Sequence, residues 1–321
     1  VTAAVNERLS LVGGFVARSR AVAGGAEPQV RTGAHCSTPY ECSFRSHCDA
    51  WQAAIDGPPP EHPIELLARR NLGRLSTLER NQISQRGWAD VRDLPDGFLA
   101  DPRTQDIARA IRNGQPWIAP GLKATLRSLP YPRFHFDFET INPAIPIWAG
   151  TRPYQQVPFQ WSCHVEHADG RLDHHEFLDI SGKDPRQECA RQLTELMGGL
   201  GGCVLVYFQD FEETRLRELA RDLPHLATGI QRAIAKLRDL LPIVRTHYYH
   251  PDQQGSYSIK AVLPTVVPEL DYAGLAEVRD GGGAQRAYLE LIDEGTDEAR
   301  SVSLSANLRA YCERDTLAMV E

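Results

Sequence analysis

Alternating aromatic and polar side chains in one short segment constrain the fold of this chain more than any other feature. Within residues 133–140, phenylalanine occupies every second position as Phe134, Phe136 and Phe138. This period of two predicts a β-strand, because successive side chains on a strand point to opposite faces of a sheet. Three aromatic side chains on one face predict that the strand is pressed firmly into a core.

The other face of the same strand carries His135, Asp137 and Glu139. Its two carboxylates stand about 7 Å apart along the strand. Beside an apolar face they repel each other and lower stability unless a cation or solvent compensates their charge. An edge strand with a solvated polar face is the ordinary explanation of an Asp-x-Glu pair. The three phenylalanines favour a buried strand instead, and with it a bound cation.

Two further segments place acidic side chains at the ends of regular elements. An apolar strand predicted over 203–208 runs directly into an amphipathic helix over 211–222, whose first turn holds Glu212. A late helix predicted over 304–320 carries Tyr311 and Asp315 on one face, one turn apart. Taken alone, each motif is typical of ordinary structure, since acidic first turns and polar helix faces are common.

The order of these three motifs is more specific than any one of them. An Asp-x-Glu strand is followed by a strand leading into Phe-Glu-x3-Leu, and then by a helix with Tyr-x3-Asp. This order resembles the DEDD exonuclease superfamily of proofreading and RNase D-like enzymes, in the branch whose last motif carries tyrosine. Residues 129–321 look like the bacterial family called domain of unknown function 2779, which belongs to that superfamily. The segment 248–264, with a helix start at Ser-Ile-Lys, strengthens the resemblance.

The resemblance implies a metal-dependent 3′→5′ exonuclease that hydrolyses phosphodiester bonds of DNA or RNA, with a single-stranded 3′ end as substrate. Hard oxygen ligands suit two Mg²⁺ or Mn²⁺ ions. Asp137 would bridge both metals, while Glu139 and Asp315 would complete the water-activating site. Glu212 would help to hold the second metal.

The same resemblance assigns roles to residues that do not bind the metals. Tyr311 would orient or deprotonate the attacking water, and its ordinary pKa of about 10 favours orientation. His250 and Lys260 are candidates for phosphate contact, and each is also explained by a structural role. Asp239 is expected to end a helix or line the cleft without binding metal.

Two positions depart from the pattern of the superfamily. Glu212 stands where aspartate is commoner, and Phe208 stands where many relatives place asparagine. Phe208 therefore favours an alternative, a catalytically inactive nucleic-acid-binding or scaffold domain of the same fold. An unrelated acidic metalloenzyme such as a phosphatase is a third hypothesis.

The pattern of predicted elements indicates an α/β fold, an RNase H-like mixed sheet flanked by helices, with a smaller and mainly helical N-terminal region. We expect a cysteine-cluster tail over residues 1–50, a helical connector over 51–128 and the RNase H-like domain over 129–321. Predicted strands cover 133–140, 156–167, 171–180 and 203–208. Predicted helices cover 64–75, 78–86, 105–112, 185–197, 211–222, 225–241, 259–266, 284–292 and 304–320.

Cysteine usage separates the N-terminal tail from the rest of the chain. Cys36, Cys42 and Cys48 are evenly spaced in a polar segment, whereas the other four cysteines fall in apolar patterns. The local sequence resembles the C-terminal cysteine group of RecB-like nucleases with an iron–sulfur cluster, whose fourth cysteine lies far upstream. A [4Fe–4S] cluster, a zinc site completed by His35 or His47, and no metal at all remain open.

Composition limits the class of protein. The net charge of −7 argues against indiscriminate coating of nucleic acid, although bound cations would neutralise an acidic nuclease site. No apolar run approaches the roughly 20 residues that a membrane span requires. Without a signal peptide or a disulfide framework, we expect a soluble cytoplasmic protein with no membrane partner. The start at Val1 leads us to expect a fragment that lacks an upstream nuclease module.

Overall fold

The computed structural model describes residues 2–38, 42–68, 72–199, 201–270, 272, 274–275 and 277–321. The chain divides into two compact units, Val1–Glu61 and His62–Glu321. The sequence predicted boundaries after residues 50 and 128 instead. Residues 62–128 belong to the unit that also contains the sheet, because they share a buried cluster with later parts of that unit.

The first unit is helical. It comprises α1 (Thr2–Ala23), the short 3-10 helix η1 (Ala34–Cys36) and α2 (Arg45–Asp56). Arg31 donates two hydrogen bonds to the carboxylate of Asp56, and Gln52 accepts one from the Thr32 backbone. These contacts tie the segment before η1 to the end of α2.

The second unit begins with short helices. They are η2 (Ile64–Ala68), α3 (Thr77–Arg86), η3 (Val91–Asp93), α4 (Pro102–Asn113) and α5 (Leu122–Arg127), with the two-residue strand β1 (Trp117–Ile118) before α5. Apart from α5, these elements place apolar side chains in one buried cluster with Leu241, Tyr249 and Tyr257, which lie far along the chain. Strand β1 also pairs with β7 (Tyr248–Tyr249). The predicted connector is therefore built into the larger unit by packing and strand pairing.

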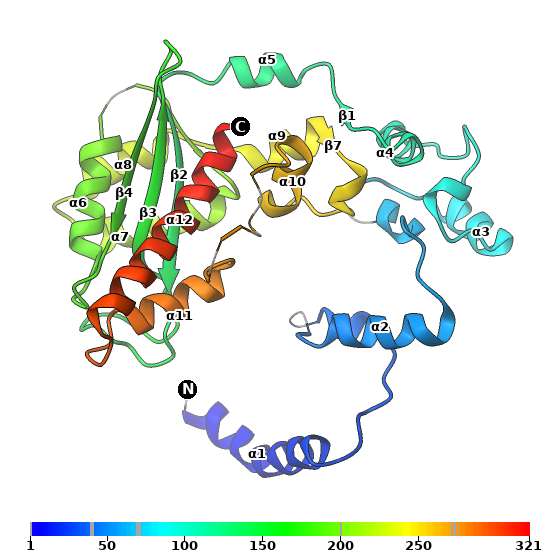
Figure 1. Cartoon of the computed structure of the whole chain (residues 1–321), viewed down its shortest axis with the longest axis horizontal. Coiled ribbons are helices and arrows are strands. Elements are labelled where there is room, and N and C mark those ends of the chain that lie inside the picture. Colours follow the sequence, from blue (N-terminus) through cyan, green and yellow to red (C-terminus); the bar gives the residue numbers. More distant parts are fainter. Residues whose placement is uncertain are drawn as a thin grey trace. The chain divides into compact units, whose positions relative to one another are not determined.

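A five-stranded mixed sheet forms the centre of this unit (Figure 1). Its strands are β2 (Arg133–Ile141), β3 (Val157–Glu166), β4 (Leu172–Leu178), β5 (Cys203–Val206) and β6 (Leu237–Asp239). They lie in the order β4-β3-β2-β5-β6, with antiparallel pairing from β4 to β2 and parallel pairing from β2 to β6. The predicted α/β class and mixed sheet are confirmed.

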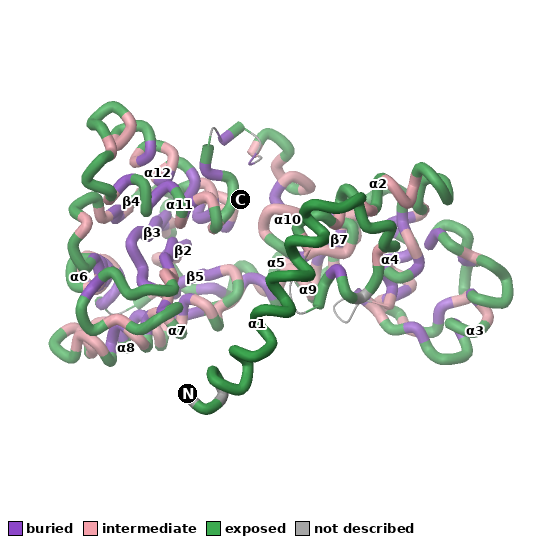
Figure 2. Tube along the Cα trace, turned by 90° about the horizontal axis from the view of Figure 1, so that it is seen from below, coloured by how far each residue is buried: buried purple, intermediate pink, exposed green. Residues whose placement is uncertain are grey.

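Helices cover both faces of the sheet. The phenylalanine face of β2 packs on α6 (Arg186–Met197), α7 (Gln209–Asp222) and α8 (Ala227–Ala235). The opposite side carries α11 (Gly281–Leu291) and α12 (Glu298–Val320). Between these layers the central strands are almost wholly buried (Figure 2). The remaining elements are α9 (Leu240–His247), η4 (Pro251–Gln253) and α10 (Ile259–Val266).

The helix predicted over 225–241 is wrong. Helix α8 ends at Ala235, and after Lys236 the residues Leu237–Asp239 form β6 beside β5. Asp239 then begins α9, since its carboxylate accepts the backbone N–H of Leu241. A long-range pairing with β5 thus overrides the local helical pattern. The helix predicted over 64–75 is also wrong in part: η2 ends at Ala68 and residues 72–76 are irregular, while 69–71 lie outside the described residues.

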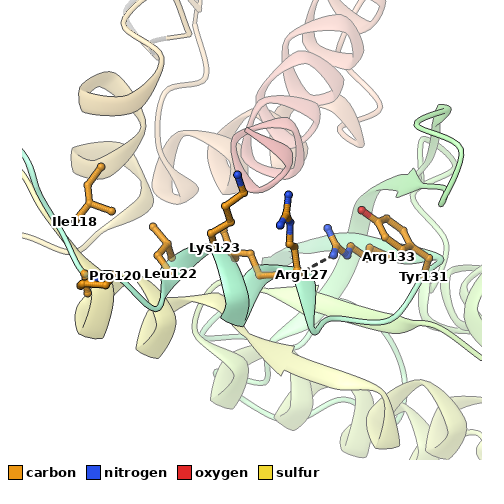
Figure 3. Close-up of a pocket in the computed structure, with 9 residues that line it drawn as sticks. Ile118, Pro120, Leu122, Lys123, Arg127, Tyr131 and Arg133 are labelled. Carbon is orange, nitrogen blue, oxygen red and sulfur yellow. Dashed lines mark hydrogen bonds between the residues drawn. The ribbon is translucent and has the colours of Figure 1, made fainter.

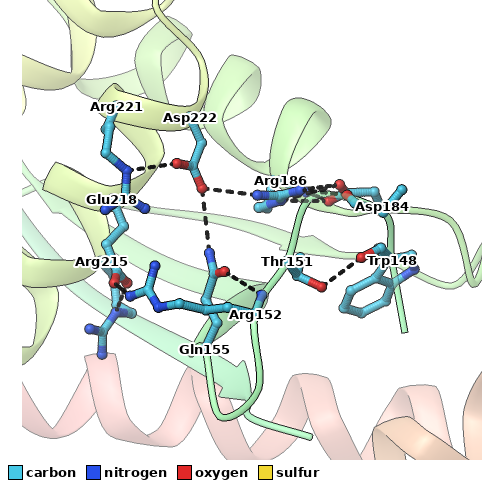
Figure 4. A network of polar contacts seen from close by, with 11 residues as sticks. Trp148, Thr151, Arg152, Gln155, Asp184, Arg186, Arg215, Glu218, Arg221 and Asp222 are labelled. Carbon is cyan, nitrogen blue, oxygen red and sulfur yellow. Dashed lines mark hydrogen bonds and ion pairs between the residues drawn. The ribbon is translucent and has the colours of Figure 1, made fainter. Parts of the chain in front are cut away.

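A polar network attaches the loop between β2 and β3 to α6 and α7 (Figure 4). Arg186 donates to Asp184 and Asp222, and Gln155 donates to Asp222 as well. One turn earlier in α7, Glu218 accepts from Arg152 at 2.6 Å. The network therefore ties the last turns of α7 to the loop between β2 and β3 and to α6.

No helix among the described residues combines the length and the apolar character that crossing a membrane would require.

We predict that Phe136→Ala lowers the free energy of unfolding by about 3–5 kcal/mol, the usual cost of removing a buried aromatic ring. Phe136 is fully buried and its ring lies 4.6 Å from that of Phe138. Urea denaturation measures the change. Leu172→Ala on the exposed edge strand is the control and should change stability by less than about 0.5 kcal/mol. Equal effects of the two substitutions would contradict the assignment of the core.

Candidate metal centre

Three carboxylates from two distant segments converge beside β2. One oxygen each of Asp137, Glu139 and Asp315 lies within 4.8 Å of the others. Asp137 and Glu139 stand on one face of β2, opposite the buried phenylalanines, as the alternating pattern predicts. Oxygen atoms at this spacing form a set that a divalent cation can bind.

Helix α12 brings Asp315 to β2 because polar side chains of β3 hold the helix on the sheet. The amide of Gln160 donates to the backbone carbonyl of Leu308 at 2.9 Å. Directly after Asp315, the hydroxyl of Thr316 lies 2.7 Å from that of Ser162. Both hydrogen bonds are buried, so they fix the rotation of the helix as well as its position.

Glu212 is the fourth carboxylate near this cluster, and it comes from the helix that follows β5. It lies in the first turn of α7, is only 2% exposed, and interacts with Asp137. Among the described residues, no hydrogen-bond partner reaches its buried Oε2 atom. A buried carboxylate oxygen without a partner is costly, and a cation would satisfy it. Glu212 is not within 4.8 Å of all three other carboxylates.

Asp239 fixes the turn that delivers Glu212. Its carboxylate accepts the backbone N–H groups of Phe208, Gln209 and Leu241 at 2.9–3.1 Å. Phe208 has a φ of +85°, a left-handed conformation that is unfavourable for a bulky residue, and its side chain is 52% exposed. Asp239 therefore begins α9 and holds the strained start of α7, whereas the sequence predicted that it ends a helix or lines the cleft.

The electrostatics of the cluster are those of an anionic site. Burial raises the pKa of Glu139 well above its usual value, and repulsion by Asp137 raises it further. Burial and the charge of Asp315 act in the same direction on the pKa of Asp137. The pKa values of Glu212 and Asp315 are raised as well, chiefly by burial. Without a cation, the fold is therefore opposed by its own carboxylates.

Two tyrosines and a lysine surround Asp315. The Tyr272 hydroxyl donates to Asp315 Oδ1 at 2.5 Å, and Lys260 Nζ donates to the Tyr311 hydroxyl at 2.9 Å. Lys260 also donates to the backbone carbonyl of Arg279. Burial and the charge of Asp315 raise the pKa of Tyr311 above its ordinary range. Tyr311 therefore carries its proton in this environment.

The carboxylates open into a cavity of about 210 Å³. It is lined by Asp137, Phe138, Glu139, Tyr207, Ile259, Lys260, Tyr311, Asp315 and Met319. Lys260 places a positive charge across from the carboxylates. The cavity thus combines acidic groups for cations with a cationic group on its wall.

The structure separates His250 from this group. His250 Nδ1 accepts the backbone N–H of Asp252 at the start of η4, and its side chain does not line the cavity. Sequence reasoning missed Tyr272, which lies in an irregular segment where no periodicity marks it. Its partner, Asp315, is 43 residues away in the chain, so no local signal could have found the contact.

The three N-terminal cysteines lie around one short loop. Cys36 ends η1, Cys48 lies in α2, and the backbone N–H of Cys42 donates to the carbonyl of Cys36 at 2.8 Å. All three are free thiols. They are not one of the groups of described residues whose ligand atoms lie within 4.8 Å of one another. A shared metal at these cysteines stays a prediction.

Comparison with known proteins identifies relatives of unknown activity. Residues 134–258 match the family described as Domain of unknown function (DUF2779), which supports the resemblance seen in the sequence. The matched segment includes Asp137, Glu139 and Glu212 but ends before Tyr311 and Asp315. The chain is also 25% identical over 210 residues to an uncharacterized protein of Ureaplasma parvum serovar 3. That alignment covers 59% of this chain and 30% of the relative. No solved structure matches the chain.

We predict that Asp137→Asn stabilises the cation-free protein by about 1–2 kcal/mol, an effect of the size that single substitutions commonly have. A folded-state pKa above the unfolded value means that the charged carboxylate opposes folding at neutral pH, so removing the charge relieves this repulsion. Thermal unfolding in chelator at pH 7.5, with and without added Mn²⁺, measures the effect.

Asp173→Asn is the matched control, because Asp173 on β4 is paired with Arg171 at 2.6 Å and with His167 at 2.9 Å. This substitution should leave stability unchanged or lower it slightly. Stabilisation by Mn²⁺ should be weaker in Asp137→Asn than in the parent. Destabilisation of the cation-free protein by Asp137→Asn would contradict the repulsion argument.

Proposed function

We propose that the larger unit is a metal-dependent 3′→5′ exonuclease of the RNase H-like, DEDD type. The observation that carries this proposal is the convergence of Asp137, Glu139 and Asp315, with Glu212 against Asp137. Their raised pKa values describe a group of carboxylates that is balanced only by cations. A solvated surface patch would not be buried in this way.

The sheet supports the same proposal. The resemblance leads us to expect a mixed sheet with helices on both faces and carboxylates on its central strand. This sheet has three antiparallel strands, β4, β3 and β2, followed by β5 and β6, which run parallel to β2. The parallel strand β5 ends beside β2 and leads into the helix that carries Glu212. Sites in α/β proteins form at such strand ends.

The carboxylates fit Mg²⁺ or Mn²⁺, since both ions prefer oxygen ligands. When bound, two such ions would supply an activated water and stabilise charge on the phosphate and leaving oxygens. Asp137, Glu139 and Asp315 would hold them, and Glu212 would offer its partnerless Oε2 atom. Tyr272 fixes the orientation of Asp315 by donating to its Oδ1 atom.

Tyr311 is suited to orienting water. Lys260 donates to the tyrosine oxygen, and the Tyr311 hydroxyl in turn bonds to the side chain of Asp315, a proposed metal ligand. The raised pKa of Tyr311 argues against a role as a base in the cation-free protein. Lys260 is then a residue that positions Tyr311, in addition to its proposed contact with phosphate.

A groove beside α5 supports a nucleic-acid substrate (Figure 3). Lys123 and Arg127 project from α5 on the same side as Tyr131, between apolar side chains. Cationic side chains attract the phosphate backbone, and aromatic rings stack on bases of single strands. Arg133 packs over the Tyr131 ring at 4.0 Å and stiffens this end of the groove.

The groove and the carboxylate cavity each share wall residues with a third cavity. A neighbouring cavity of about 330 Å³ shares Leu122 and Leu126 with the groove, and it shares Tyr207 and Met319 with the carboxylate cavity. We propose that a single strand lies along α5 and that its end reaches the carboxylates. For the first unit, we propose that Cys36, Cys42 and Cys48 contribute to an iron–sulfur or zinc site.

An assay with single strands labelled at either end tests the function. We expect Mn²⁺-dependent release of mononucleotides from the 3′ end, abolished by chelator and by Asp137→Asn, because this substitution removes a metal ligand. DNA and RNA strands of the same sequence are compared. Binding of the strands without hydrolysis would favour the inactive scaffold, and hydrolysis of small phosphate esters alone would favour a phosphatase.

We predict that Tyr311→Phe lowers the turnover number by about 10²–10⁴-fold, the usual contribution of a positioned acid–base group. The ring remains, so thermal stability and Mn²⁺ binding should survive. Tyr154→Phe is the control, since that tyrosine is exposed and does not line the cavity. Turnover of Tyr311→Phe within about a factor of two of the parent would show that the tyrosine is structural.

A further inference from the structure

A second group of metal-binding side chains lies where α12 crosses β3 and β4. We propose that His164, His174 and Glu313 form a site for a zinc-class divalent cation, and that this cation clamps α12 to the sheet. The proposal concerns a site separate from the carboxylate cluster and does not depend on nuclease activity.

The geometry brings the three side chains together from three elements. His164 on β3 pairs directly with His174 on β4, and their rings stack with centroids 4.5 Å apart. Glu313 reaches them from α12. One ligand atom from each of the three residues lies within 4.8 Å of the others. Ligand atoms around tetrahedral zinc lie about 3.3 Å apart, so a small movement of the exposed side chains closes the site.

Hydrogen bonds orient both imidazole rings. Nδ1 of His164 lies 2.8 Å from the Thr316 hydroxyl, and Nε2 of His174 lies 2.9 Å from the Ser162 hydroxyl. The two hydroxyls also bond to each other at 2.7 Å. Each ring thus uses one nitrogen for a hydroxyl, which leaves the other nitrogen for a ligand. This division of the two nitrogens is the usual arrangement of histidines that bind metals.

The ligand types select the class of cation. Imidazole nitrogen suits zinc and its transition-metal neighbours, whereas Mg²⁺ prefers oxygen ligands. Two histidines and one carboxylate leave a fourth position for water, as in other zinc sites with three protein ligands.

The site can be reached from solvent, and it lies beside the turn of α12 that carries Asp315. The side chains of His174 and Glu313 are 26% and 48% exposed, so a cation can enter from solvent. Thr316, which holds His164, follows Asp315 directly in α12. A cation that joins Glu313 to both strands would restrict the turn of α12 that carries Asp315. Because its ligands come together only in the folded chain, the cation should also raise thermal stability.

The test uses a background chain in which other metal sites are removed. This chain carries Cys36→Ser, Cys42→Ser, Cys48→Ser and Asp137→Asn, and it is kept in millimolar Mg²⁺ to occupy the remaining carboxylates. Co²⁺ is titrated and followed by its visible absorption, and the rise in the thermal midpoint with Zn²⁺ is measured in parallel. His174→Ala and Glu313→Gln are then introduced separately.

His175→Ala is the matched control, because His175 is the exposed neighbour of His174 on β4 and alternate strand positions face opposite sides of the sheet. We expect one Co²⁺ per background chain, with affinity at least about tenfold weaker in His174→Ala and in Glu313→Gln, and unchanged in His175→Ala. The rise in the thermal midpoint should disappear in the same two variants. No Co²⁺ binding by the background chain, or equal binding by parent and His174→Ala, would overturn the proposal.

Discussion

The packing of α12 on the polar face of the sheet is the contact on which the rest of the site depends. Gln160 reaches a backbone carbonyl of the helix, and Ser162 and His164 both reach Thr316. These side chains stand at alternate positions of β3, opposite the polar residues of β2. One register between two strands therefore sets the position of the helix, and the helix sets the position of Asp315 beside Asp137.

The same packing creates an electrostatic conflict. The phenylalanine face of β2 is buried in the core under α6, α7 and α8, which holds the strand in place. Its other face must then keep Asp137 and Glu139 in a poorly solvated cleft, where burial and mutual repulsion raise their pKa values. Tyr272 and Lys260 relieve part of this cost around Asp315. Such a conflict is expected where function, not stability, selects the side chains.

Much of the site could be predicted from the sequence because its motifs follow the periods of their elements. The alternation over 133–140 determined which face of β2 bears the carboxylates, and the four-residue spacing placed Tyr311 beside Asp315. Contacts between distant segments could not be predicted in this way. Residues 237–239 look helical by themselves and become a strand only through β5. Tyr272 lies in an irregular segment, and the pairing of His164 with His174 requires the register of a hairpin.

The domain boundaries also depend on contacts between distant segments, which local sequence patterns do not reveal. Residues 64–111 carry their own helical patterns, but their buried cluster is completed by Leu241, Tyr249 and Tyr257. Composition and turn signals mark where elements end, and they do not reveal which elements share a core. The boundary after Glu61 follows from this shared burial.

The position of α12 in the chain also has a consequence for biosynthesis. Asp137 leaves the ribosome long before Asp315, and the sheet strands that precede α12 can pair before that helix is made. Until α12 is made, Gln160 and Ser162 lack the helix that covers them. The carboxylates of β2 then have neither Asp315 nor Tyr311 beside them. A nascent chain thus lacks the complete carboxylate cluster, which forms only after the helix has docked.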